Sequence, residues 1–281
     1  MAGRPHAITG HTCLAAVIGH PVQHSLSPRI HNAAFAAAGL DWTYVAFEVD
    51  PANGAAAVDA MRTLGIGGLS VTMPHKAAAA MAADERTPTV ERLGVANCLF
   101  WRNGRIVADS TDGDGFVAAF EHGTGQDLAG RSIGVIGAGG AARSIIEALG
   151  RNRVADIVVV NRSETTLADA VALAVQARAG TADDLATLDI IVNTTPVGMA
   201  GGSEAGRCPI DADLISASHS VVDIVYNPLE TPLLAAAAER GATVQGGVPM
   251  LVHQAALAFR RWTDREPPIE TMMAAVADQL G

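Results

Sequence analysis

Apolar runs alternate with helical periods along the first 110 residues. The β-rich or buried runs predict strands at 15–19, 42–49, 69–73, 97–101 and 105–109. Amphipathic spacing predicts helices over 28–38 and 51–64, with Ser27 as N-cap, Pro28 in the first turn and Gly65 as the stop. An Asn-Gly pair between the last two strands indicates a hairpin. This pattern predicts an α/β region.

The middle of the chain has a more regular pattern. Apolar runs predict strands at 132–136, 156–160, 190–193 and 221–225. A glycine-rich turn and an apolar helix ending at Leu149 join the first two of them, which is the order of a βαβ unit in a parallel sheet covered on both faces. The stretch 250–262 returns to a helical period. We therefore expect a second domain of the doubly wound type.

Composition narrows the class of protein. The 281 residues include 19 basic and 29 acidic ones, a formal net charge of −10, and 49% are hydrophobic. The negative field disfavours nucleic acid and anionic membranes, and no run is long and apolar enough for a membrane span. Cys13, Cys98 and Cys208 are odd in number and widely spaced, which indicates neither a disulfide framework nor a zinc site. We expect a cytoplasmic protein without a bound metal.

One residue stands out in this composition. Lys76 is the only lysine in the chain, so the other basic residues are all arginines. An amine can give up and regain a proton, whereas a guanidinium stays charged at any ordinary pH. Chance retention of a surface lysine is the alternative.

The segment Gly137-Ala138-Gly139-Gly140-Ala141-Ala142 lies between a predicted strand and a predicted helix. In this context glycines permit a tight turn and let a pyrophosphate approach the backbone at the helix start. The next strand ends in Asn161-Arg162-Ser163 instead of an acidic residue, which favours a 2′-phosphate and hence NADP over NAD. The alternatives are a glycine turn without a ligand and a solvated surface arginine.

Further polar residues cluster near predicted element ends. Ser25 and Ser27, beside a helix start, can hold a small carboxylate, or they serve as a turn residue and a cap. Lys76 follows a strand, and Asp112 follows the hairpin. Brought together they could share a proton, with an ordinary surface ion pair as the alternative. His20 and His24 are separated by Pro21, which argues against a metal pair.

Together these segments resemble the shikimate dehydrogenase family over nearly the whole chain. The resemblance rests on G-H-P-V-x-H-S-x-S-P-x-x-H-N (19–32), V-T-x-P-x-K (71–76), the Asn of G-V-A-N (97), T-D-G-x-G-F (111–116), G-A-G-G-A-A-R (137–143), N-R-S (161–163), T-P-V-G-M (195–199), D-x-V-Y-N-P-x-x-T-P-L-L (223–234) and G-V-P-M-L-x-x-Q-A-A (247–256). It implies reversible oxidation of shikimate to 3-dehydroshikimate with NADP, a step of aromatic amino-acid biosynthesis.

The resemblance also implies roles for individual residues. Lys76 and Asp112 become the catalytic pair. The substrate-binding residues implied are Ser25, Ser27, Thr72, Asn97, Tyr226 and Gln254. The cofactor-binding residues implied are Gly137, Ala138, Gly139, Gly140, Ala141, Asn161, Arg162, Ser163, Thr195, Ile224, Gly247 and Met250.

The implied fold is α/β with two domains. Residues 1–111 with 247–281 form an N-terminal α/β substrate-binding domain, and residues 112–246 form a Rossmann-like NADP-binding domain. The expected partner is a small molecule, without nucleic acid or membrane, and the protein is a monomer or a homodimer.

The chain departs from the family pattern at three places. Ser70 and Ser110 replace asparagines near the catalytic pair, and Glu164-Thr165-Thr166 stands where many members have a second arginine. Two alternatives therefore stay open. One is an enzyme for quinate, an aminoshikimate or another cyclic polyol acid, with NAD as a second cofactor choice. The other is a non-catalytic NADP-binding regulator.

Overall fold

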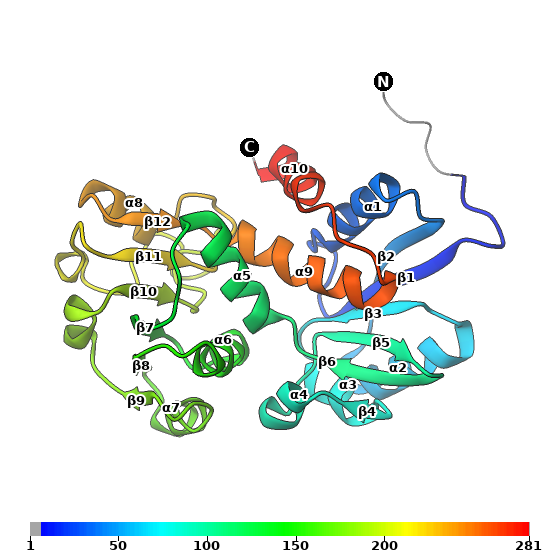
Figure 1. The fold of residues 1–281 in the computed structure, drawn as a ribbon, viewed down its shortest axis with the longest axis horizontal. Helices are drawn as coiled ribbons and strands as arrows, with labels where there is room; N and C mark the ends of the chain where they lie inside the picture. Colours follow the sequence, from blue (N-terminus) through cyan, green and yellow to red (C-terminus); the bar gives the residue numbers. More distant parts are fainter. Residues whose placement is uncertain (1–6, 281) are drawn as a thin grey trace. The chain divides into compact units, whose positions relative to one another are not determined.

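The computed structural model describes residues 7–280 and divides into two compact units (Figure 1). Unit 1 contains the chain up to Thr111 together with Gln254–Gln279, and unit 2 contains Asp112–His253. The first boundary lies directly before helix α5 (Asp112–Thr124), and the second lies within helix α9 (Val248–Thr263). Each unit is built around its own six-stranded sheet.

Unit 1 has a mixed sheet. Its strands, in spatial order, are β2 (Trp42–Glu48), β1 (Cys13–Gly19), β3 (Gly68–Val71), β5 (Cys98–Arg102), β6 (Arg105–Asp109) and β4 (Glu85–Arg86). Strand β1 runs parallel to β2 and β3, whereas β5 runs antiparallel to both β3 and β6. The carboxyl ends of β1, β3 and β6 and the beginning of β5 therefore lie at the same edge of the sheet.

Unit 1 contains the two predicted helices, with the second preceded by a 3-10 turn, and further helices that the sequence pattern did not predict. The helices are α1 (Ser27–Ala37), α2 (Gly54–Leu64) after the 3-10 turn η1 (Pro51–Asn53), α3 (Lys76–Ala82), α4 (Pro88–Leu93) and α10 (Ile269–Leu280). Gly65 ends α2 with a φ of 66°, as predicted. The prediction that Ser27 is the N-cap was wrong: α1 begins at Ser27 itself, because the Ser25 hydroxyl accepts its N–H at 3.3 Å.

The hairpin prediction is confirmed. Strands β5 and β6 pair antiparallel and are joined by Asn103 and Gly104, whose φ angles are 52° and 74°. Both values lie in the left-handed region that a two-residue type I′ turn requires, and Asn and Gly tolerate it best.

An aromatic cluster fills one side of the unit 1 core. The His31 ring is 1% exposed and stacks on Tyr44 at 4.4 Å between ring centroids, with the Trp262 ring 4.8 Å away. Trp262 also donates from Nε1 to the Leu99 carbonyl at 3.0 Å. A side chain at Gly68 would meet the Trp262 indole at 2.4 Å, so only glycine lets α9 pack this closely.

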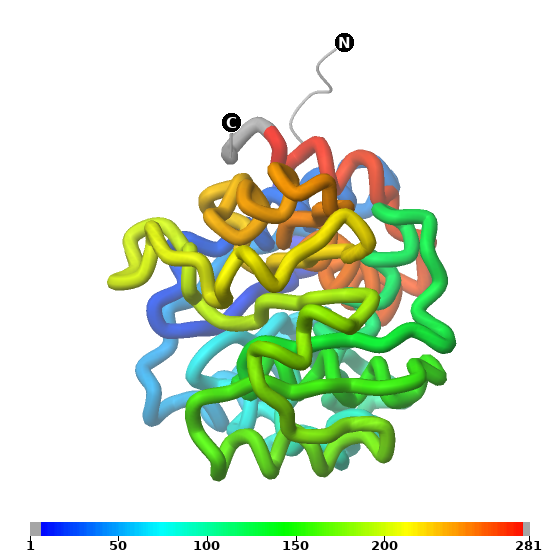
Figure 2. Tube along the Cα trace, turned by 90° about the vertical axis from the view of Figure 1, so that its left-hand side faces the viewer, coloured from blue at the N-terminus to red at the C-terminus, as the bar shows by residue number. Residues whose placement is uncertain are grey.

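Unit 2 has a fully parallel sheet, as predicted for a doubly wound domain. Its strands, in spatial order, are β12 (Thr243–Gln245), β11 (Ser220–Asp223), β10 (Ile190–Asn193), β7 (Ser132–Ile136), β8 (Asp156–Val160) and β9 (Ala177–Ala179). In Figure 2 the green tube of β8 and β9 lies at one edge of this sheet and the yellow to orange tube of β11 and β12 at the other. The remaining elements of unit 2 are α6 (Gly140–Arg151), α7 (Glu164–Val171), α8 (Pro232–Glu239), η2 (Ala182–Thr187) and η3 (Ala212–Leu214).

Alternate residues of these strands face opposite sides. Val159 and Val192 belong to a buried cluster that includes α5 and α6, whereas their neighbours Val158 and Ile191 belong to one that includes Leu185 and α8. This two-residue period buries both faces and explains why the strands read as continuous apolar runs. The predicted bounds 132–136, 156–160 and 190–193 are confirmed, while the last strand ends at Asp223 instead of residue 225.

No helix in the described range 7–280 has the length and apolar character needed to cross a membrane.

We expect His31 to make the stability of the protein depend on pH. Burial lowers the pKa of His31 to about 3 in the folded chain, below the ordinary value of 6.5. As the pH falls from 6.5 towards 3, the unfolded chain binds this proton and the folded chain does not. The free energy of unfolding should therefore decrease by up to about 1.4 kcal/mol per pH unit on account of His31.

Replacing the buried ring tests this directly. His31→Phe should flatten the decrease in urea unfolding free energy between pH 6.5 and 4, whereas His11→Asn, a change at an exposed histidine, should keep the parental slope. Parallel curves for the parent and His31→Phe would contradict the expectation.

Candidate active site

The polar edge of the unit 1 sheet collects most of the predicted substrate residues. Ser25 and Ser27 follow β1, Thr72 and Lys76 follow β3, and Asn97 precedes β5. The Thr72 N–H donates to the Ile18 carbonyl at 2.9 Å, and the Ala96 N–H donates to the Lys76 carbonyl at 3.0 Å. These backbone bonds join neighbouring loops, so residues distant in sequence lie at one edge.

Asn97 and Gln254 are brought together although 157 positions separate them. The Asn97 amide donates to Gln254 Oε1 at 3.3 Å and to the Thr111 hydroxyl at 3.0 Å, and it accepts the Thr111 N–H at 2.7 Å. Arg261 lies seven residues after Gln254 in α9 and donates from Nε to the buried Asp109 carboxylate at 2.9 Å. This bond and the Trp262 contact hold the end of α9 against the sheet.

Tyr44 is a candidate site residue that the sequence analysis missed. It is 2% exposed, and among the described residues its hydroxyl has no hydrogen-bond partner. Burial raises the pKa of Tyr44 above its ordinary value, and the nearby hydroxyls of Ser70 and Ser27 partly oppose the rise. A buried donor without a partner is costly unless a ligand satisfies it. The only sequence signal was that Tyr44 is one of just two tyrosines.

The predicted catalytic pair is divided between the units. Lys76 is the first residue of α3 and is half-buried, next to a buried His75 whose Nε2 is 2.9 Å from the Val49 carbonyl oxygen. Asp112 is the first residue of α5 in unit 2 and is also half-buried. The pairing of Lys76 with Asp112 therefore stays a prediction. Tyr226, a further predicted substrate residue, also belongs to unit 2, where burial raises its pKa.

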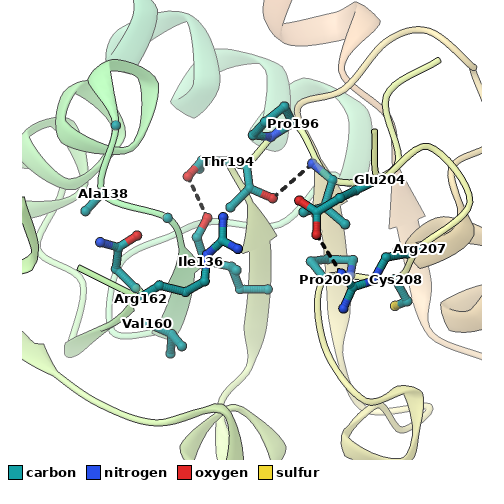
Figure 3. Close-up of a pocket in the computed structure, with 15 residues that line it drawn as sticks. Ile136, Ala138, Val160, Arg162, Thr194, Pro196, Glu204, Arg207, Cys208 and Pro209 are labelled. Carbon is teal, nitrogen blue, oxygen red and sulfur yellow. Dashed lines mark hydrogen bonds and ion pairs between the residues drawn. The ribbon is translucent and has the colours of Figure 1, made fainter. Parts of the chain in front are cut away.

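A pocket of about 470 Å³ opens at the carboxyl edge of the unit 2 sheet (Figure 3). The predicted cofactor residues that line it are Gly137, Ala138, Gly139, Asn161, Arg162 and Thr195. Thr194, Pro196 and Val197 add a wall from the loop after β10, and Glu204 and Arg207 stand on the side opposite Arg162. The sequence analysis missed Glu204 and Arg207, because they lie in a segment without a recognised motif.

Six predicted cofactor residues do not line this pocket. Gly140 and Ala141 begin α6, and Ser163 precedes α7. Gly247 packs against the backbone of Ile224, where an added Cβ would lie 2.1 Å from the Ile224 carbonyl oxygen. Met250 is a buried core residue, 9% exposed.

The glycines of the turn 137–140 are there for different structural reasons. Gly137 has a φ of 109°, and a Cβ there would lie 2.5 Å from the Thr194 hydroxyl oxygen. At Gly139 and Gly140 no described atom would lie within 4 Å of an added Cβ. Gly137 is therefore required by the turn itself, whereas Gly139 and Gly140 leave the start of α6 open to an anion.

A buried network fixes the loop after β10, which contributes Thr195 to the pocket. The Asp223 carboxylate accepts from Asn193 Nδ2 at 3.0 Å and from the Thr231 hydroxyl at 2.7 Å. Asn193 Oδ1 in turn accepts the Thr195 hydroxyl at 2.7 Å and the Thr195 N–H at 3.0 Å. Burial raises the pKa of Asp223, and the donors from Thr231, Val225 and Asn193 oppose this rise.

Models of one enzyme family match three parts of the chain. The shikimate dehydrogenase substrate binding domain matches residues 17–99, shikimate / quinate 5-dehydrogenase matches residues 120–200, and the shikimate 5'-dehydrogenase C-terminal domain matches residues 247–277. Among curated proteins, the chain is 40% identical to the shikimate dehydrogenase (NADP(+)) of Moorella thermoacetica, over 96% of this chain and 94% of the relative.

Solved structures give the same result. Shikimate 5-dehydrogenase from Listeria monocytogenes in complex with shikimate and NAD has a TM-score of 0.90 and 32% identity, covering 96% of this chain and 98% of the other. Shikimate 5-dehydrogenase from Thermus thermophilus in complex with NADP(H) and shikimate has a TM-score of 0.86 and 35% identity, covering 95% and 99%.

Two alanine substitutions should show which glycine the turn itself requires for stability. Gly137→Ala should lower the free energy of unfolding by about 1–3 kcal/mol, because alanine at positive φ is strained and its Cβ meets Thr194. Gly139→Ala should leave stability within about 0.5 kcal/mol, since its Cβ points into open space. Thermal and urea unfolding of both variants checks this, and equal destabilisation would refute the distinction.

Proposed function

The chain belongs to the shikimate dehydrogenase family, and we propose that it catalyses the reversible oxidation of shikimate to 3-dehydroshikimate with NADP. The observation that carries this proposal is the polar edge of the unit 1 sheet, where Asn97 lies beside Gln254 and the buried Tyr44 hydroxyl has no partner among the described residues, in a chain that also has a glycine-lined pocket with Arg162. The first suits a small polyol acid, and the second suits a dinucleotide.

The pocket of unit 2 fits NADP by its donor chemistry. Gly139 and Gly140 leave the backbone at the start of α6 open, which suits a pyrophosphate. Arg162 follows strand β8 by two residues and offers a fork of N–H donors to the 2′-phosphate. NADP bound there would supply the hydride acceptor for oxidation of the alcohol.

Unit 1 would hold the substrate through hydroxyl and amide groups. We assign the carboxylate to Ser25, Ser27 and the buried Tyr44 hydroxyl, which has no protein partner among the described residues. Thr72, Asn97 and Gln254 of unit 1 would bind the ring hydroxyls, and Tyr226 of unit 2 stays a further predicted ligand of the substrate. Because such groups would be left unsatisfied by an analogue that lacks a hydroxyl, discrimination should be strong.

The proton transfer is assigned to Lys76. Its amine takes the proton of the reacting hydroxyl during oxidation and returns it to the carbonyl oxygen in the reverse direction. Asp112 would orient the amine and stabilise the cation that forms. An arginine could not replace Lys76 in this role, since its guanidinium does not release a proton at ordinary pH.

The same proposal includes a division of labour between domains. Residues 1–111 with 247–281 would bind substrate, and residues 112–246 would bind NADP. We further expect the protein to work in the cytoplasm, which three cysteines without a disulfide support, and without nucleic acid, which the net charge of −10 supports. A monomer or homodimer is expected.

A second candidate is an enzyme that prefers NAD or another cyclic polyol acid such as quinate. Arg162 is followed by the acidic Glu164, which weakens the attraction for a 2′-phosphate. Ser70 and Ser110 place short hydroxyls in unit 1 where family members have asparagine, and Ser70 lies near the Tyr44 hydroxyl. These positions bear on substrate and cofactor choice, not on the type of reaction.

Initial rates would distinguish the two candidates. The purified protein is offered shikimate or quinate, each with NADP and with NAD, and formation of reduced nicotinamide is followed by absorbance. We expect turnover mainly with shikimate and NADP. Turnover confined to quinate or to NAD would favour the second candidate. A complete lack of turnover in all four combinations would contradict the proposed reaction and point to a different polyol acid or to the non-catalytic regulator.

Lys76→Met should lower kcat by at least about 1000-fold while the KM for shikimate changes little, because the proton acceptor is lost and the shape is nearly retained. Met81→Ala, on the exposed side of the same helix, is the matched control and should keep kcat within twofold. Circular dichroism verifies that both variants fold. A Lys76→Met variant with parental kcat would remove Lys76 from the mechanism.

A further inference from the structure

The unit 2 pocket contains a second cation opposite Arg162. Arg207 lines the same pocket, and Figure 3 shows it entering from the wall across from Arg162. Its Nη1 lies 2.7 Å from Glu204 Oε1, while the Arg207 side chain remains 72% exposed. The ion pair thus restrains the guanidinium without burying it, so most of its donors stay accessible to a ligand.

The wall around Arg162 has few donors left for a 2′-phosphate. The Asn161 amide nitrogen already donates to the Ser163 carbonyl at 3.0 Å and to the Thr166 hydroxyl at 2.8 Å. The acidic Glu164 follows directly after this segment. A phosphate that carries nearly two negative charges is therefore incompletely compensated by Arg162 alone.

The backbone of the opposite loop holds Arg207 in position. The Gly198 N–H and the Arg207 N–H both donate to the Glu204 carbonyl, at 3.0 Å and 3.1 Å. Gly198 has a φ of 89°, which lets the chain turn back after the pocket residue Val197. Residues 198–207 therefore form a closed loop that presents Glu204 and Arg207 on the same side.

We propose that Arg207 is the second cationic ligand for the 2′-phosphate of NADP, and that Glu204 keeps its guanidinium in place before the cofactor binds. The proposal rests on the proposed function, since it concerns the same pocket. A guanidinium has two donor edges, so one edge can stay with Glu204 while the other binds a phosphate oxygen. Glu204 also makes the site less positive, which limits the preference for NADP over NAD.

The test measures binding of two fragments that differ only in this phosphate. Adenosine 2′,5′-bisphosphate and 5′-AMP are titrated into the full chain by calorimetry at low ionic strength. Arg207→Ala should weaken the bisphosphate about tenfold, the size of one partly solvated charge-assisted hydrogen bond, and should change 5′-AMP by less than about twofold. Arg207→Lys should give an intermediate loss, because it keeps the charge and loses the fork.

Two further variants sharpen the result. Glu204→Gln removes the competing charge and should tighten the bisphosphate about threefold. Arg178→Ala is the matched control: Arg178 is a half-exposed arginine of the same unit, paired with Asp156 at 3.1 Å, and it does not line the described pocket. It should leave both titrations unchanged.

The outcomes separate this inference from the proposed function. If Arg207→Ala weakens both fragments equally, Arg207 contacts the adenosine or only supports the loop, and the proposal is overturned. An unchanged affinity of Arg207→Ala for the bisphosphate overturns it as well. If Arg162→Ala loses the bisphosphate selectively and Arg207→Ala does not, Arg207 alone is wrongly assigned. If neither fragment binds the parent protein, the cofactor assignment fails as well.

Discussion

The candidate cofactor site depends on the hydrogen bonds that connect the carboxyl ends of the parallel strands in unit 2. The Gly137 N–H donates to the Val160 carbonyl at 2.8 Å, the Thr194 N–H to the Ile136 carbonyl at 2.9 Å and the Ile224 N–H to the Asn193 carbonyl at 3.1 Å. Each of these hydrogen bonds lies one residue beyond the end of a strand, and a loop begins after it. The strand order reverses between β7 and β10, and the loops that diverge at such a point leave a crevice at the carboxyl edge of the sheet.

Unit 1 reaches a similar arrangement from a mixed sheet. Strands β1, β3 and β6 end at the polar edge, and the antiparallel β5 begins there, so Asn97 enters the site from the start of a strand while Thr72 enters from the end of one. The hairpin turn at Asn103-Gly104 is therefore part of the site's construction. It reverses the chain at the far edge and returns Thr111 to hydrogen-bond distance of Asn97.

The two units differ in the groups that they offer to an anionic ligand. A chain with net charge −10 repels anions in general, so anionic ligands must be held by local donors. Unit 2 offers the open start of α6 with Arg162 and Arg207, whereas the described serine and tyrosine hydroxyls of unit 1 are neutral. In the proposed function the hydroxyls bind the substrate carboxylate, and Lys76 is left for the proton transfer.

The sequence alone determined the α/β class, the strands 132–136, 156–160 and 190–193, the hairpin and the glycine turn, because periodicity and turn chemistry are local properties. It assigned a capping role to Ser27 that the structure gives to no side chain. Only the tertiary structure placed Gln254 beside Asn97, left the Tyr44 hydroxyl without a partner among the described residues, and set Arg207 across from Arg162. These relations join segments far apart in the chain, and no local pattern encodes such contacts, since they arise when whole elements pack.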